Sequence, residues 1–150
     1  MTIRSARMPD APAICELINY HAERGRMLHR SLEDVYSTMR AFLVAEADGQ
    51  TVGCVAVAVT WTDLAEVRSL AVAPQWLGRG VGSALLAAAI DDARRLGVRK
   101  LFALTYEKDF FARRGFEVLD RQTLPEKVWR ECIACPKRDC CDETAMMLTL

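Results

Sequence analysis

The sequence lacks an excess of charge of either sign. Its 20 lysines and arginines equal its 20 aspartates and glutamates, so the formal net charge at pH 7 is zero. Proteins that bind nucleic acid or anionic membrane surfaces usually carry a basic excess or a basic stripe. We therefore expect small-molecule ligands, and neither a nucleic-acid nor a membrane partner.

The sequence also lacks a long apolar run. The longest, at residues 52–59, is far shorter than the roughly 18 residues of a membrane-spanning helix, and the start of the chain shows no apolar export signal. Its 150 residues are 51% apolar and 27% charged, a composition typical of one ordinary folded domain. We expect a single domain over residues 1–150, located in the cytoplasm.

Four of the six cysteines are concentrated near the C-terminus. Cys15 and Cys54 stand alone in apolar patterns, as small buried thiols usually do. The other four lie within ten residues of a segment at about 122–143, and they are Cys132, Cys135, Cys140 and Cys141. Two cysteines separated by two residues have a spacing typical of metal ligands.

Three interpretations of this cysteine cluster stay open. In the first, Cys132, Cys135 and Cys141 bind a structural zinc, in preference to an iron–sulfur cluster. The fourth ligand would come from His21, His29, Asp142 or the remaining cysteine. In the second, the segment is a redox-active or disulfide-bonded loop, and in the third it holds plain reduced thiols.

Hydrophobic periodicity predicts one mixed sheet with flanking helices. Strands are expected at residues 3–6, 41–47, 51–62, 65–72, 100–105, 116–119 and 144–150. Helices are expected after Asp10, from Ser31 to about residue 40, at 80–96 and at 108–114. Asp48-Gly49 predicts a hairpin between the second and third strands. This order is that of an α/β (α+β) domain.

A glycine-rich loop joins the fourth strand to the longest helix. Gly78, Gly80 and Gly82 allow tight turns and close approach to a ligand. The start of the helix presents unpaired N–H groups and a positive dipole end, which suit a pyrophosphate. The loop has neither the lysine of a Walker loop nor the dinucleotide spacing. A glycine-rich turn without a ligand is the alternative.

The sequence resembles the GCN5-related N-acetyltransferase (GNAT) family at two motifs. The pattern Gln-x-x-Gly-x-Gly at Gln75, Gly78 and Gly80 resembles the acetyl-CoA motif of the family. Residues 110–116, which end in Gly115-Phe116, resemble its second signature. The resemblance implies acetyl-CoA as co-substrate and a mostly antiparallel mixed sheet, splayed between its fourth and fifth strands and flanked by helices.

The resemblance also implies which residues bind acetyl-CoA. The pantetheine arm would follow the backbone of the fourth strand, and the N–H of Leu70 would polarise the thioester carbonyl. The glycine loop would hold the pyrophosphate, and Arg79 would reach the phosphates or lie in solvent. The full implied set is Leu70, Ala71, Val72, Gln75, Leu77, Gly78, Arg79, Gly80, Val81, Gly82, Ser83 and Phe111.

A closer resemblance, to the acetyltransferase domain of bacterial N-acetylglutamate synthases, implies the acceptor. It rests on the segments at residues 28–31, 65–72, 100–105 and 123–126. It implies transfer of acetyl to the α-amino group of L-glutamate, the first step of arginine biosynthesis. The amino-acid-kinase-like domain of the full-length synthases does not fit in 150 residues, so arginine feedback through it is not implied.

Charged residues around the fourth strand match a dicarboxylate amine. Strand alternation places Glu66 and Arg68 on one face. Arg68 and Arg30 would each bind a carboxylate, and Glu66 would take the proton of the amine through a water. A structural Glu66–Arg68 ion pair is the alternative. Ser31 would contact the substrate or cap the second helix, and we expect the cap.

Phe111 stands where many relatives of the family have a tyrosine that protonates the CoA thiolate. A tyrosine acid is therefore not implied at that position, and water or Tyr106 would serve. Two other functions stay open. The chain could acetylate another small amine or a protein N-terminus, or it could be a non-catalytic acetyl-CoA sensor with a metal-binding loop. A homodimer is compatible with each of these functions.

Overall fold

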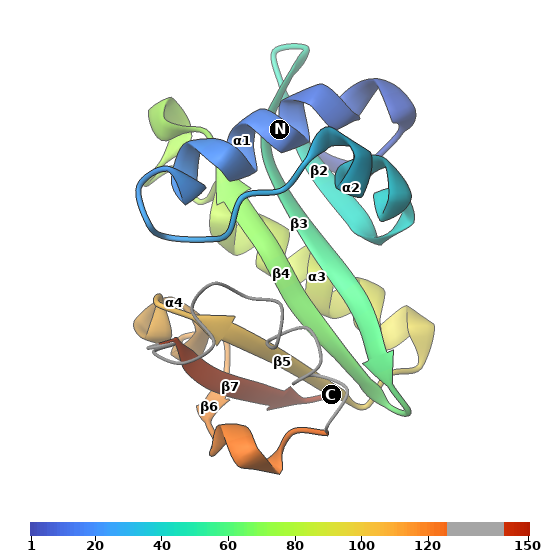
Figure 1. Ribbon diagram of the computed structural model, residues 1–150, viewed down its shortest axis with the longest axis vertical. Coiled ribbons are helices and arrows are strands. Elements are labelled where there is room, and N and C mark those ends of the chain that lie inside the picture. The colour runs from blue at the N-terminus through green and yellow to red at the C-terminus, as the bar shows by residue number, and fades with distance from the viewer. Residues whose placement is uncertain (126–142) are drawn as a thin grey trace. The chain divides into compact units, whose positions relative to one another are not determined.

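The computed structural model describes residues 1–125 and 143–150. Within these residues, seven strands form one sheet in the order β1-β2-β3-β4-β5-β7-β6 (Figure 1). The strands are β1 Thr2–Ser5, β2 Phe42–Ala47, β3 Gln50–Trp61, β4 Leu64–Val72, β5 Lys100–Thr105, β6 Glu117–Val118 and β7 Thr144–Thr149. The helices are α1 Ala11–Ala22, α2 Leu32–Ser37, α3 Val81–Leu96 and α4 Lys108–Ala112. The predicted order of strands and helices is confirmed.

The chain divides into two compact units. The first contains residues 1–57 and 67–92, and the second contains residues 58–66 and 93–150. Strands β3 and β4 each contribute to both units. No helix among the described residues is long and apolar enough to cross a membrane.

In the first unit, β1, β2 and β3 pair antiparallel. Asp48 and Gly49 form the tight turn between β2 and β3, with φ angles of 53° and 74°. Two consecutive left-handed residues are the requirement of a type I′ turn, which Asp-Gly meets at low cost. The predicted hairpin is therefore confirmed.

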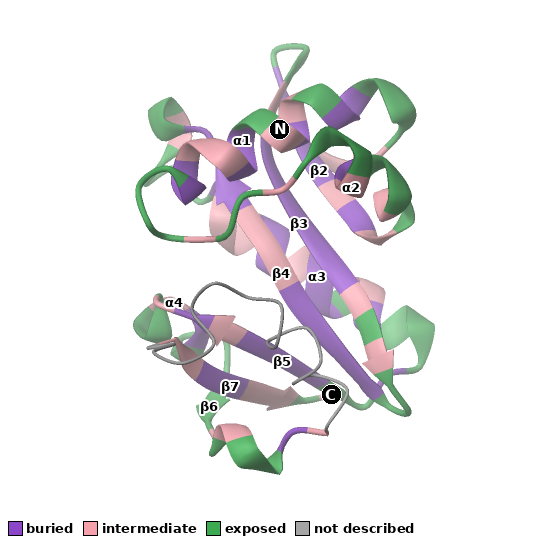
Figure 2. Cartoon of the chain, in the orientation of Figure 1, coloured by how far each residue is buried: buried purple, intermediate pink, exposed green. Residues whose placement is uncertain are grey.

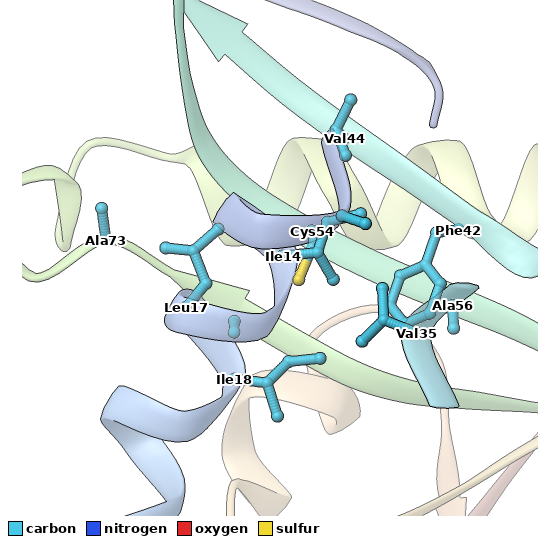
Figure 3. Close-up of a cluster of buried hydrophobic side chains, with 11 residues drawn as sticks. Ile14, Leu17, Ile18, Val35, Phe42, Val44, Cys54, Ala56 and Ala73 are labelled. Carbon is cyan, nitrogen blue, oxygen red and sulfur yellow. The ribbon is translucent and has the colours of Figure 1, made fainter. Parts of the chain in front are cut away.

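Helices α1 and α2 cover one face of this part of the sheet. Residues of α1 at helical spacing, Ile14, Leu17 and Ile18, pack against strand side chains such as Phe42 and Cys54 (Figure 3). Every member of this cluster is less than 9% exposed, so the apolar stripe that the sequence shows on α1 is the core-facing stripe.

Helix α3 packs on the opposite face. Gly53 alternates with Cys54 along β3, and a Cβ added to Gly53 would lie 2.8 Å from Leu85 and 3.1 Å from Val81. The lack of a side chain at Gly53 therefore lets α3 approach the sheet closely. Figure 1 shows α3 behind β3 and β4, and α1 in front.

In the second unit, β7 pairs antiparallel with both β5 and β6. The start of β4 pairs with β5 in parallel, from Leu64↔Lys100 to Glu66↔Phe102. The core here is formed by Leu64, Phe102, Leu124 and Ala145. Figure 2 shows β5 and the start of β4 largely buried. The mixed, mostly antiparallel sheet is confirmed, whereas its opening between β4 and β5 concerns both units and stays a prediction.

The second helix is shorter than predicted. It ends at Ser37 rather than near residue 40, and a short 3-10 helix, Met39–Ala41, follows. The hydroxyls of Ser37 and Thr38 both donate to the carbonyl of Asp34, at 2.9 and 2.8 Å. Such side-chain hydrogen bonds compete with helix continuation, which explains why the helix ends there.

Candidate functional site

The glycine loop lies in the first unit, between the end of β4 and the start of α3. Gly78 and Gly80 have φ angles of 76° and 84°, in the region that only glycine adopts without strain. No atom lies within 4 Å of a Cβ added at either position. The loop therefore needs these glycines for its backbone conformation and not for space.

The loop presents backbone donors to solvent. Residues 77–80 are exposed, and the carbonyl of Gly80 already accepts the N–H of Ala84, so α3 begins directly after Gly80. The N–H groups of Val81, Gly82 and Ser83 have no acceptor in the preceding turn of a helix. Together with the positive end of a 16-residue helix, they suit an anion such as a pyrophosphate.

Arg79 is held beside this loop by an aromatic ring. Its guanidinium carbon lies 4.8 Å from the centre of the Trp76 ring, and Trp76 packs on the core of the first unit. A cation–π contact of this kind restricts a long side chain. Arg79 is therefore already placed at the glycine loop, where a phosphate would lie.

Strand β4 contains a kink that the sequence does not announce. Ser69 has a φ of 56°, a left-handed conformation that costs a non-glycine residue of the order of 1–2 kcal/mol. Two side chains contact it. The guanidinium of Arg30 donates to Ser69 Oγ at 2.9 Å, and the thiol of Cys54 donates to the Ser69 carbonyl at 3.4 Å. These contacts stabilise the conformation that the strand alone would avoid.

Arg30 is fixed by three acceptors. Besides Ser69, it donates to Asp34 at 2.6 Å and to Thr38 at 3.1 Å, and its side chain is only 12% exposed. An arginine has five N–H donors, so two of them are left for a ligand. The structure thus brings Arg30 next to the Arg68–Leu70 stretch of β4, as an acceptor-binding role requires, but its tight anchoring was not foreseen.

The remaining acceptor candidates lie on α2 and β4. Ser31 caps α2, with its Oγ accepting the N–H of Asp34 at 3.0 Å, so the predicted cap is confirmed. Arg68 is half-buried in the first unit. Glu66 is 9% exposed and belongs to the second unit, where it lies opposite Phe102 in the β4–β5 ladder.

A buried histidine supports the end of β4. His21 is 8% exposed, and its Nε2 lies 2.7 Å from the carbonyl oxygen of Val72. Since this nitrogen is occupied, His21 is a poor choice as the fourth metal ligand. The sequence placed His21 on the apolar face of its helix but gave no signal for its partner 51 residues away.

The aromatic residues of the second signature form part of a core. Phe111 is 5% exposed and makes edge-to-face contacts with Phe110 and Phe116, with ring centres 5.4 and 5.2 Å away. A phenyl ring has no proton to give, so Phe111 does not act as the acid. Tyr106, one residue after β5, is half-buried and stays a candidate.

The cysteines divide between described and undescribed parts of the chain. Cys54 is fully buried, as predicted, while Cys15 is half-buried and contacts the carbonyl of Arg30 at 3.4 Å. The predicted zinc ligands Cys132, Cys135 and Cys141 lie outside the described residues. Within residues 1–125 and 143–150, no group of three metal-ligating side chains is present.

Burial makes Cys54 a source of alkaline sensitivity. It raises the pKa of the thiol from an ordinary 9.0 to about 12. The unfolded chain therefore loses this proton above pH 9 while the folded chain keeps it to about pH 12. The stability that the neutral thiol provides is complete below pH 9 and is lost between pH 9 and 12, at about 1.4 kcal/mol per pH unit.

We expect Cys54→Ala to flatten this loss. Urea unfolding at fixed pH values from 8 to 11 should show a shallower decline in the free energy of unfolding than in the wild type. Val44→Ala is the matched control, because Val44 is the cross-strand partner of Cys54 and has no ionisable group. It should lower stability equally at every pH, and parallel declines for Cys54→Ala and wild type would contradict the expectation.

Comparison with known proteins agrees with this geometry. Residues 5–116 match the acetyltransferase (GNAT) family. An uncharacterised N-acetyltransferase of Chlorobaculum tepidum is 41% identical over 148 residues, which cover 99% of this chain and 96% of that protein. An amino-acid acetyltransferase of Mycobacterium tuberculosis is 37% identical over 132 residues, which cover 86% and 75% of the two chains.

A solved structure gives the same result in three dimensions. The N-acetylglutamate synthase of Neisseria gonorrhoeae, crystallised with coenzyme A and N-acetyl-glutamate, superposes with a TM-score of 0.90 at 34% sequence identity. The match covers 99% of this chain and 35% of the synthase, so the similarity concerns about a third of that protein.

Proposed function

This chain belongs to the acetyltransferase (GNAT) family, and on that premise we propose that it transfers the acetyl group of acetyl-CoA to the α-amino group of L-glutamate. The observation that carries the acceptor is the placement of Arg30 against Ser69, next to Arg68 on β4. Two guanidinium groups at one stretch of strand suit an amine that carries two carboxylates. The M. tuberculosis and N. gonorrhoeae relatives named above support the same class of acceptor.

In the proposed reaction the amine attacks acetyl-CoA directly while both are bound. Glu66 accepts a proton from the ammonium group through a water, which frees the lone pair of the nitrogen. The nitrogen then forms a bond to the thioester carbon, and the N–H of Leu70 stabilises the resulting oxyanion. The C–S bond breaks, the nitrogen loses its second proton, and the CoA thiolate takes up one proton from water or Tyr106.

The glycine loop provides the other half of the binding energy. We propose that the N–H groups at the start of α3 and Arg79 bind the pyrophosphate, while the backbone of Leu70–Val72 holds the pantetheine arm. Because His21 occupies the carbonyl of Val72, the arm would use the other backbone groups of this stretch. We expect the reaction to take place in the cytoplasm, and a homodimer stays a prediction.

Removing a carboxylate partner is expected to raise KM for glutamate. Arg68→Ala should raise it by one to two orders of magnitude, since a hydrogen bond to a charged group is worth about 1.5–3 kcal/mol. The assay is thiol release from acetyl-CoA over a panel containing glutamate, glutamine and amines without a carboxylate. The KM of an amine without a carboxylate should not change, which provides the internal control.

The same panel separates the alternatives. Preference for glutamine or a neutral amine over glutamate would refute the glutamate acceptor while leaving the acetyltransferase function. Tight binding of acetyl-CoA without turnover on any amine or peptide N-terminus would instead favour the non-catalytic sensor.

A further inference from the structure

The inference concerns the backbone on either side of Leu70, and it rests on the proposed role of the Leu70 N–H. Two backbone groups flank this residue, the carbonyl of Ser69 and the N–H of Ala71. The Cys54 thiol donates to the first at 3.4 Å and receives a hydrogen bond from the second. A single buried sulfur on β3 thus contacts both peptide groups that adjoin Leu70.

These two contacts fix the direction of both polar groups of Leu70. In a trans peptide the C=O and the N–H point in opposite directions, and the described chain contains no cis peptide bond. Since the Ser69 carbonyl points to Cys54, the Leu70 N–H in the same peptide points away from it. By the same argument, the Leu70 carbonyl points away because the Ala71 N–H points toward Cys54.

Arg30 fixes the same kink through the side chain of Ser69. Its guanidinium is held by Asp34 and Thr38 and donates to Ser69 Oγ at 2.9 Å. Ser69 is left-handed, with a φ of 56°, so its peptide groups depart from regular strand geometry. The kink is therefore fastened at its carbonyl by Cys54 and at its side chain by Arg30.

We propose that Cys54 is a positioning residue for acetyl transfer, which together with Arg30 holds the Ser69 kink so that the Leu70 N–H is aimed at the thioester carbonyl. Cys54 itself lies in the apolar cluster beneath α1 (Figure 3) and touches no reacting atom. Its contribution is the direction of a hydrogen-bond donor, and it acts on the rate of transfer and not on the affinity for either substrate.

The test measures the polarisation of the carbonyl directly. The ¹³C signal of [1-¹³C]acetyl-CoA should move downfield when it binds the wild-type protein, because a hydrogen bond withdraws electron density from the carbonyl carbon. Cys54→Ala should lose most of this shift and lower kcat about tenfold, a part of what removal of a whole oxyanion donor costs. The Kd for CoA and the KM for the acceptor should stay within about twofold of wild type.

Two variants separate positioning from packing. Cys54→Ser keeps a group that can donate to Ser69 and accept from Ala71, and it should retain the downfield shift and most of kcat. Val44→Ala truncates the cross-strand partner in the same cluster, and it should lower Tm without changing the shift. Ser69→Gly removes the contact with Arg30, and it should lose part of the shift even if Cys54→Ala does not fold.

The outcomes distinguish this inference from the function on which it rests. A wild-type shift that persists in Cys54→Ala and Ser69→Gly would overturn the positioning role alone. A Cys54→Ser variant that behaves like Cys54→Ala would also overturn it, since volume rather than hydrogen bonding would then matter. A wild-type protein whose bound carbonyl keeps the signal of free acetyl-CoA would refute the Leu70 donor itself, and the inference with it.

Discussion

Replacement of Glu66 by glutamine is expected to lower kcat for acetyl transfer by about two to three orders of magnitude, the range typical of a lost general base. Glutamine keeps the shape of the side chain but cannot accept the proton of the ammonium group. Glu66 is 9% exposed in the second unit, so the isosteric change avoids a cavity. Thiol release from acetyl-CoA at saturating glutamate measures the effect.

The pH profile and a matched carboxylate provide the controls. The acidic limb of kcat/KM, where a base becomes protonated, should be present in the wild type and absent in Glu66→Gln. Glu46→Gln removes the charge of a carboxylate that binds Arg4 at 2.8 Å, and it should leave kcat unchanged. A Glu66→Gln enzyme with wild-type kcat across the pH range would exclude Glu66 as the base.

Replacement of Gly80 by valine is expected to weaken acetyl-CoA binding by about two orders of magnitude. Gly80 has a φ of 84°, a conformation that a β-branched residue avoids strongly. The loop would have to change its backbone path, and the N–H groups that face the pyrophosphate would be displaced. Each lost hydrogen bond to a charged group costs about 1.5–3 kcal/mol. Isothermal titration with CoA measures the change in Kd.

Gly49→Val is the matched control for this variant. Gly49 has a similar φ of 74°, and no atom lies within 4 Å of its added Cβ, but it belongs to the β2–β3 hairpin turn. It should lower stability to a similar extent without changing the affinity for CoA. Equal affinities for CoA in folded Gly80→Val and wild-type protein would remove the pyrophosphate from this loop.

Much of the fold and part of the site follow from local sequence patterns. The stripe of Ile14, Leu17 and Ile18 marks a helix face, Asp48-Gly49 marks a hairpin, and Gly78 and Gly80 mark a loop in which backbone N–H groups approach a ligand. Each pattern depends on residues within one or two turns of each other, where propensity and periodicity act. The end of α2 was missed because two hydroxyl groups compete with the helix at the carbonyl of Asp34.

The sequence by itself therefore determined the order of the elements, the glycine loop and the family, because these depend on near neighbours along the chain. Only the tertiary structure decided how β4 is shaped at Ser69. The contacts there join residues far apart in sequence: Arg30 to Ser69 across 39 positions, Cys54 to Ser69 across 15 and His21 to Val72 across 51. A serine is not a residue that marks a left-handed strand position, and a lone buried cysteine shows no partner until the sheet is formed. The kink exists because packing supplies hydrogen bonds that outweigh its local strain.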